Sequence, residues 1–246
     1  MRDERKSVMC ITNLNGHSMN NTDVIPKVTA FFSQKPERSC KKGEMILRPG
    51  DPISNVYYVQ TGLIRLYCLL GDGKELTLNI FKPRSYFPMF LILNDASNLH
   101  YFQAMTASRL SYASKEEIVH FITNEQDVLL DFTKRLSVGL NGLITTIQYS
   151  LFGSVHTRII SALLLLAKRF GEPVPGGSVL IAIHLTHQDI ANIVGVARET
   201  VSLEMEKLGK KNLVVDKRRK ISILNVPRLK EEALIDDETQ ITDYSL

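Results

Sequence analysis

The sequence is poor in cysteine and has no long apolar run, and each absence excludes a class of protein. Its three cysteines, Cys10, Cys40 and Cys68, are widely spaced and form no CxxC pair, so neither a disulfide framework nor a zinc ribbon is expected. No segment approaches the roughly 20 apolar residues of a membrane-spanning helix. The amino-terminal stretch MRDERKSVMCITNLNGHSMN is charged and polar and lacks the apolar core of a signal peptide. We therefore expect a cytoplasmic protein with reduced thiols and no membrane partner.

The formal net charge of +4 is unevenly distributed along the 246 residues. Residues 1–153 carry 17 Lys and Arg against 14 Asp and Glu, residues 154–230 carry 13 against 6, and residues 231–246 carry 0 against 6. The basic excess therefore belongs to one segment, residues 154–230. Residues 229–246 are predicted to form an acidic tail.

Short strand-like runs separated by turn residues fill the region from residue 40 to residue 115. Two runs flank Gly62, and Asp72-Gly73 is typical of a tight hairpin. This regular spacing predicts a small antiparallel β-barrel or jelly roll within residues 24–124. Residues 1–23 show no clear periodicity and are predicted to be a disordered extension, with Met19 as a second candidate for the translation start.

Residues 125–153 change to a helical period, with apolar residues in steps of three or four. The steps follow a near-heptad pattern, and one continuous helix of this length needs something to cover its apolar stripe. Two interpretations are open, packing against the barrel or a dimer seam formed by Leu136, Leu140, Leu143 and Ile147. Gly139 and Gly142 disfavour an isolated helix and would allow a partner to approach closely.

The segment 154–228 has the element order of a winged helix-turn-helix. An apolar helix, a Pro/Gly loop and a strand near residues 179–185 precede two short helical patterns, and two short strands joined by a basic turn follow them. Thr186 and Asp189 have capping-box spacing at the start of the first short helix. Gly195 supplies the positive φ that turns the chain between the two helices.

The second short helix is predicted to begin near Arg198, and in this motif its first turns face the major groove of DNA. Arginine can donate two hydrogen bonds to guanine, and glutamate can accept one from cytosine. We predict that the base-reading residues are Arg198, Glu199 and Ser202. The predicted contacts to the DNA backbone are Thr186, His187, Gln188, Thr200, Lys217, Arg218 and Arg219.

Two stretches resemble the Crp/Fnr family of bacterial transcription regulators. QDIANIVGVARETVS is similar to the family's helix-turn-helix signature, and KGEMILRPGDPISNVYYVQTGLIRLY is similar to its barrel opening, with Gly43, Gly50 and Gly62 at turn positions. The resemblance covers residues 24–228. It implies an α+β fold with a barrel like a cyclic-nucleotide-binding jelly roll, a dimerisation helix over residues 125–153 and a winged helix-turn-helix domain. It also implies a homodimer on a palindromic site in double-stranded DNA, with RNA polymerase as a further partner of an activator.

The chain departs from the family where cyclic nucleotides bind. Members that bind them carry Gly-Glu and, some ten residues later, an arginine for the cyclic phosphate. Here Pro88 and Met89 take the first place and Asn98 the second, which removes the charge-assisted bond. Three scattered cysteines do not suffice for an iron–sulfur cluster, which needs four thiolates. His100 is the only histidine of the strand-rich region 40–115 that could bind haem, and a lone histidine is more often structural, so no cofactor is expected.

The same region is rich in apolar side chains, which allow two interpretations. They form either a plain barrel core or a pocket for a small apolar effector against the long helix. The residues predicted for that pocket are Phe87, Met89, Phe90, Tyr101 and Phe102.

The second helix also departs from the family's pattern. Ala197 stands where a serine caps the helix, Leu203 replaces a base-reading or phosphate-binding arginine, and Glu204 stands where an apolar residue is usual. We expect the base normally read by that arginine to be relaxed or changed.

An enzyme built on the barrel is the alternative from another class. A cupin-like metal enzyme needs two or three imidazoles and a carboxylate around one metal. The barrel has no HxH pair, so neither catalysis nor a metal site is expected.

Overall fold

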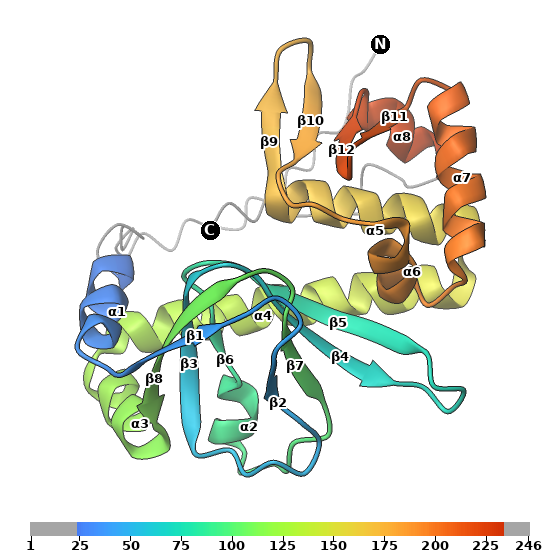
Figure 1. The fold of residues 1–246 in the computed structure, drawn as a ribbon. Coiled ribbons are helices and arrows are strands. Elements are labelled where there is room, and N and C mark those ends of the chain that lie inside the picture. The colour runs from blue at the N-terminus through green and yellow to red at the C-terminus, as the bar shows by residue number, and fades with distance from the viewer. Residues whose placement is uncertain (1–23, 234–246) are drawn as a thin grey trace, which may run out of the picture.

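The computed structural model describes residues 24–233, which form two domains and a long helix that runs beside both (Figure 1). The predicted extension 1–23 and residues 234–246 of the predicted tail lie outside the described residues. The helix, α4, spans Gln126–Phe152 and agrees with the predicted continuous helix. Within the described range, no helix is long and apolar enough to cross a membrane.

The N-terminal domain contains two antiparallel four-stranded sheets, with strand orders β1-β8-β3-β6 and β2-β7-β4-β5. The two sheets do not close into one hydrogen-bonded barrel. Of the two predicted forms, barrel or jelly roll, the jelly roll is confirmed. The strands are β1 Glu37–Cys40, β2 Met45–Leu47, β3 Asn55–Thr61, β4 Ile64–Leu69, β5 Glu75–Phe81, β6 Tyr86–Phe87, β7 Tyr101–Ala104 and β8 Ser108–Ser114.

The chain passes from one sheet to the other at Gly62, between β3 and β4. Gly62 has φ +88°, and a Cβ atom there would clash with Ser108 Oγ and lie 2.6 Å from the carbonyl oxygen of Ala107. Only glycine fits this close contact. Strands β3 and β4, on its two sides, belong to different sheets. The predicted hairpin at Asp72-Gly73 is confirmed, because β4 and β5 pair across it.

Three helices cover the N-terminal sheets: α1 Val24–Ser33, α2 Met89–Leu93 and α3 Lys115–Asn124. Helix α3 begins at a capping box formed by Ser114 and Glu117. Apolar residues of α1, α3 and the start of α4 share one buried core with β3, including Phe32, Val56 and Val128. This core anchors the first turns of α4 to the N-terminal domain.

The C-terminal domain packs helices around a third four-stranded sheet, of order β11-β12-β10-β9. The elements are α5 Val155–Phe170, β9 Gly171–Val174, β10 Ser178–Ile181, α6 His187–Val194, α7 Arg198–Lys210, β11 Val214–Lys217, β12 Lys220–Ile223 and α8 Val226–Glu232. Strand β9 lies where the sequence predicted a loop. Pro173 pairs there with Val179 on an edge strand, where proline is tolerated because no ladder partner needs its missing N–H.

The C-terminal boundary predicted at residue 228 is wrong. Helix α8 crosses it, and Leu229 and Ala233 are buried in the core of the C-terminal domain. Burial of these apolar side chains makes residues 229–233 part of the domain rather than part of an acidic tail.

The two domains touch where α6 lies against β5 (Figure 1). Asn192 of α6 donates to Glu75 Oε2 (3.2 Å), and Arg65 of β4 forms an ion pair with the same carboxylate (2.6 Å). Ile80 of β5 is 3% exposed and belongs to the core of the C-terminal domain. A strand of one domain therefore completes the core of the other.

Candidate DNA-binding surface

Helix α6 begins at the predicted capping box. The Asp189 N–H donates to Thr186 Oγ1 (3.1 Å), and the Thr186 N–H donates to Asp189 Oδ2 (2.7 Å). The Thr186 hydroxyl also donates to this carboxylate (2.6 Å). These bonds satisfy N–H groups at the start of α6, and they occupy the hydroxyl of a residue that was predicted to contact the DNA backbone.

Gly195 turns the chain from α6 to α7 in the left-handed conformation, with φ 73° and ψ 41°. Its N–H donates to the carbonyl oxygen of Ala191 (2.8 Å) and closes the last turn of α6. A Cβ atom at this position would meet Leu76 Cδ1 at 3.5 Å and Arg158 Nη2 at 3.7 Å, which are ordinary contacts. Backbone conformation rather than lack of space therefore requires glycine here.

Helix α7 separates a buried face from an exposed face. Val201, Met205 and Leu208 are buried in the C-terminal core, whereas Arg198 and Glu199 are exposed. Ala197 makes no side-chain cap, as its sequence predicts. The first turn of α7 thus presents a guanidinium and a carboxylate to solvent. Of the other predicted contacts, Thr200 is half-buried, and Gln188 is exposed and donates to Asn192 Oδ1 (2.7 Å).

His187 joins α6, α7 and the hairpin through its two ring nitrogens. Nδ1 lies 2.8 Å from Ser202 Oγ, and Nε2 lies 3.1 Å from Asp216 Oδ2. The Ser202 hydroxyl donates to the carbonyl oxygen of Arg198 (3.1 Å). His187 and Ser202 were predicted as separate DNA contacts, and the structure places them in one network that sets the position of the α7 face against the hairpin.

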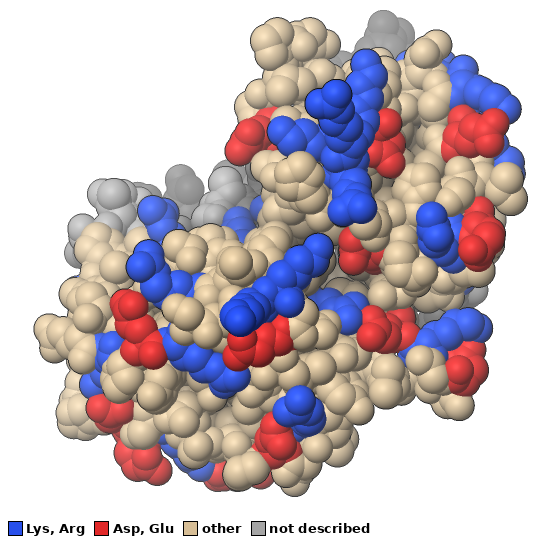
Figure 2. All heavy atoms as spheres, viewed as in Figure 1, with Lys and Arg blue, Asp and Glu red and all other residues tan. Residues whose placement is uncertain are grey.

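The tip of the β11–β12 hairpin carries four exposed cations, Lys217, Arg218, Arg219 and Lys220. Figure 2 shows Lys and Arg side chains gathered over this region of the C-terminal domain. The backbone of Arg218 and Arg219 is left-handed, with φ 54° and 65°, where Asn and Gly are usual in a tight hairpin. The hairpin therefore keeps two arginines at its tip at a conformational cost of roughly 1–2 kcal/mol each.

Glu204 has partners that sequence reasoning missed. Its carboxylate lies 2.6 Å from His156 Nδ1 of α5 and accepts from Lys207 Nζ (2.7 Å). The other His156 nitrogen lies 3.2 Å from Glu232 Oε1 of α8. Glu204, an acidic residue at a usually apolar position of α7, thus pairs with a histidine 48 residues away. In the sequence, the only signal of this contact was the unusual acidic residue itself.

The predicted seam on α4 is uncovered in the single chain. Leu136, Leu140, Leu143 and Ile147 are between 46% and 59% exposed. A Cβ atom added at Gly139 or Gly142 would meet nothing within 4 Å. The interpretation that the stripe packs against its own N-terminal domain is therefore wrong for these four residues.

The five residues predicted to line an effector pocket do not share one cavity. Phe87 and Phe102 are stacked with ring centroids 5.2 Å apart, and both are buried. Met89 is buried in the core beneath α1, Phe90 is 38% exposed, and Tyr101 stacks on a neighbouring strand's tyrosine. Phe87, Met89 and Phe102 therefore form part of a plain core, and the five residues do not line one pocket as predicted.

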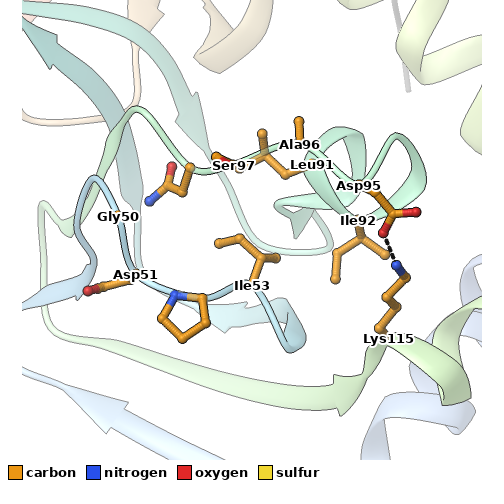
Figure 3. Close-up of a pocket in the computed structure, with 11 residues that line it drawn as sticks. Gly50, Asp51, Ile53, Leu91, Ile92, Asp95, Ala96, Ser97 and Lys115 are labelled. Atoms are coloured by element: carbon orange, nitrogen blue, oxygen red, sulfur yellow. Dashed lines mark hydrogen bonds and ion pairs between the residues drawn. The ribbon is translucent and has the colours of Figure 1, made fainter.

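A cavity of about 320 Å³ lies elsewhere in the N-terminal domain, between the loop after β2 and the segment from α2 to β7 (Figure 3). Ile53, Leu91 and Ile92 supply apolar walls, and Lys115 forms an ion pair with Asp95 at one side. No arginine lines it. Asn98 also lines it, and its amide donates to the carbonyl oxygens of Arg48 (2.6 Å) and His100 (2.9 Å).

Cysteine and histidine are sparse in both domains. Cys40 is buried, Cys68 is half-buried, and both thiols are free. Within residues 24–233, no group of three or more His, Cys, Asp or Glu side chains is placed to hold a metal ion.

Both domains match known families. Residues 37–125 match the cyclic nucleotide-binding domain family, and residues 157–232 match the Crp-like helix-turn-helix domain family. The chain is 27% identical over 213 residues to the global nitrogen regulator of Synechocystis sp., covering 86% of this chain and 91% of that protein. It is 28% identical over 197 residues to the transcriptional regulator SdrP of Thermus thermophilus, covering 79% and 93%.

Solved structures share the arrangement of the two domains. A CRP/FNR-family transcriptional regulator from Thermus thermophilus has a TM-score of 0.64 at 27% identity, with 81% of this chain and 98% of that chain covered. A CooA variant from Carboxydothermus hydrogenoformans has a TM-score of 0.72 at 23% identity, with 83% and 90% covered, which is a likeness of fold. With a jelly roll, a long helix and a Gly195 turn leading into an exposed α7, the chain belongs to the Crp/Fnr family of DNA-binding transcription regulators.

Proposed function

We propose that the chain regulates transcription as a cytoplasmic homodimer that places two α7 helices on a palindromic operator. The observation that carries this proposal is the exposed first turn of α7, where Arg198 and Glu199 face solvent. His187 links α7 to the hairpin that carries the exposed cations, through Ser202 and Asp216. Helix-turn-helix dimers of this kind bind half-sites about one DNA turn, roughly 34 Å, apart. The uncovered apolar stripe of α4 supplies a surface for the second copy.

In this arrangement, one set of residues recognises DNA bases and another binds the DNA phosphates. Arg198 donates to a guanine and Glu199 accepts from a cytosine in the major groove. Lys217, Arg218 and Arg219 neutralise phosphates through the hairpin, which raises affinity for every sequence alike. Ser202 lies on the same side of α7, and its position depends on His187.

Operator selection from a random DNA pool tests the proposal. Arg198→Ala should weaken binding to the selected operator by about 1–3 kcal/mol and flatten the preference at one base pair. Arg218→Ala is the matched loss of one positive charge, and it should weaken binding to all sequences and reduce the salt slope by about one unit. An unchanged selected sequence with Arg198→Ala would show that α7 is not the reading helix.

We also infer that cyclic nucleotides do not control the protein and that it is not an enzyme. Asn98 stands where an arginine would hold the cyclic phosphate, and its amide is bonded to two backbone carbonyls. Phe81, Phe87 and Phe102 stack across the interior of the jelly roll. Titration calorimetry with cyclic AMP and cyclic GMP should therefore give no binding heat, and micromolar affinity for either would contradict the inference.

A further inference from the structure

Leu203 is unusual in the C-terminal domain because its large apolar side chain is exposed to solvent. Its side chain is 60% exposed. Among residues 154–233, no other Leu, Ile, Val, Met or Phe falls in the exposed class. A leucine in this position stays in contact with water in the free protein, whereas full burial of such a side chain is worth about 1.5–3 kcal/mol.

The helix geometry aims Leu203 away from the core. Successive residues are rotated by about 100°, so Leu203 lies nearly opposite the buried side chains of Val201 and Leu208. It follows Glu199 by four residues and therefore shares its face, one turn further along α7. Leu203 is thus placed beside a residue that we propose reads a base.

The surroundings of Leu203 do not suit a protein partner. Protein interfaces form on contiguous apolar patches. On the exposed face of α7, the charged residues one turn from Leu203 are Glu199 on one side and Glu206 and Lys207 on the other, and Glu206 forms an ion pair with Lys210 (2.6 Å). A single apolar side chain among charged groups fits a small, isolated apolar target.

The major groove offers one such target. Thymine presents its C5-methyl group there, and an aliphatic side chain recognises that methyl by van der Waals contact. Building on the proposed function, we propose that Leu203 is a specificity-determining residue that reads a thymine methyl in the operator. A leucine cannot donate to guanine or accept from cytosine, so this contact changes which base is preferred at that position.

Deletion of one methyl group from the DNA tests the contact. An operator is selected with the full chain, and the base pair read by Leu203 is the one whose preference disappears with Leu203→Ala. Thymine at that position is then replaced by deoxyuridine, which removes the methyl and keeps every hydrogen-bonding group. The wild-type protein should bind the deoxyuridine duplex roughly fourfold more weakly, as expected for the loss of one buried methyl group. Leu203→Ala should bind both duplexes equally.

Two variants serve as controls. Leu203→Met keeps an apolar side chain of similar volume and should retain the thymine preference. Leu69→Ala removes an exposed leucine from β4, in the other domain, and should leave the selected sequence unchanged. Equal wild-type binding to the thymine and deoxyuridine duplexes, or an unchanged thymine preference in Leu203→Ala, would overturn the inference and leave the proposed function standing. Failure to select any operator would overturn both.

Discussion

At the scale of single residues, glycine is required at one position for its backbone conformation alone and at another also because a side chain would not fit. Gly195 needs a positive φ, although a Cβ atom there would make only ordinary contacts. Gly62 needs both a positive φ and the absence of a side chain. Gly209 needs neither, since it lies within α7 and a Cβ atom would have Val214 O as its nearest neighbour, at 3.8 Å.

Replacement of Gly195 and of Gly209 by alanine should change the free energy of unfolding in opposite directions. Gly195→Ala forces a side chain into the left-handed region and should lower the free energy of unfolding by about 1–2 kcal/mol. Gly209→Ala reduces the freedom of the unfolded chain and should raise it by roughly 0.4–1 kcal/mol. Urea denaturation of both variants measures the two values. Equal destabilisation by the two replacements would contradict the conformational explanation of the turn.

At the scale of elements, α7 is held by polar contacts on its sides as well as by its apolar face. Glu204 ties it to α5 through His156, and Ser202 ties it to α6 and β11 through His187. Burial raises the pKa of the Glu204 carboxyl, but hydrogen bonds from Lys207 and His156 lower it more, so its pKa lies below the usual value. The carboxylate therefore stabilises the folded protein in its charged form.

Glu204→Gln should destabilise the protein in a pH-dependent way. Near pH 6 the loss should be about 1–2 kcal/mol, because the glutamine oxygen can still accept a hydrogen bond but lacks the negative charge that pairs with Lys207. A lowered folded-state pKa gives stability that is present above the unfolded pKa of about 4.3 and is lost as the pH falls through the folded value. The difference from the wild type should therefore shrink below about pH 4.

Glu206→Gln is the matched control on the same helix. Its ion pair with Lys210 is exposed, so stability near pH 6 should not change measurably. Chemical denaturation across the pH range checks both variants. A pH-independent loss in Glu204→Gln would show that the charge of Glu204 is not what stabilises this contact.

The α4 stripe makes a separate prediction about assembly. Ile147→Asp should give monomers and abolish specific DNA binding, because an unpaired charge buried in a seam costs several kcal/mol. Asn141→Asp also places a carboxylate on α4, but on a different face at about 100° per residue, and should leave the proposed dimer intact. Sedimentation gives the mass of both variants. An unchanged dimer mass in Ile147→Asp would mean that the seam lies elsewhere.

At the scale of the whole molecule, the core of the C-terminal domain includes a residue of the N-terminal domain. Ile80 belongs to a strand of the N-terminal jelly roll, yet its side chain is buried among residues of the C-terminal domain. Asn192 and Glu75 add a hydrogen bond beside it, between α6 and β5. Strand β5 of the N-terminal domain is therefore in direct contact with α6, the helix that precedes α7.

Ile80→Ala should destabilise the C-terminal domain although the residue lies outside it in sequence. Removal of a buried isoleucine costs about 2–5 kcal/mol, because it leaves a cavity. Hydrogen exchange should become faster in α5 and α6. Ile64→Ala removes an equally buried isoleucine from the N-terminal core, and its faster exchange should stay in β3, β4 and β7. Unchanged exchange in α5 and α6 of Ile80→Ala would contradict a shared core.

Local features of this protein are determined by the sequence alone. The Thr186–Asp189 cap, the Gly195 turn, the hairpin at Asp72-Gly73 and the helical stripe of α4 each depend on residues a few positions apart. Backbone sterics and hydrogen bonds between such neighbours act before any distant contact forms, so spacing suffices to predict them.

Contacts between distant residues were decided only by the tertiary structure. Phe87 and Phe102, predicted to line a pocket, stack on each other in the core. Leu229, predicted to lie in the tail, is buried in the C-terminal domain. His156 became the partner of Glu204 because α5 and α7 pack against each other. Such pairings depend on which surfaces the folded chain brings together, and residue type alone does not distinguish a side chain that lines a cavity from one that fills it.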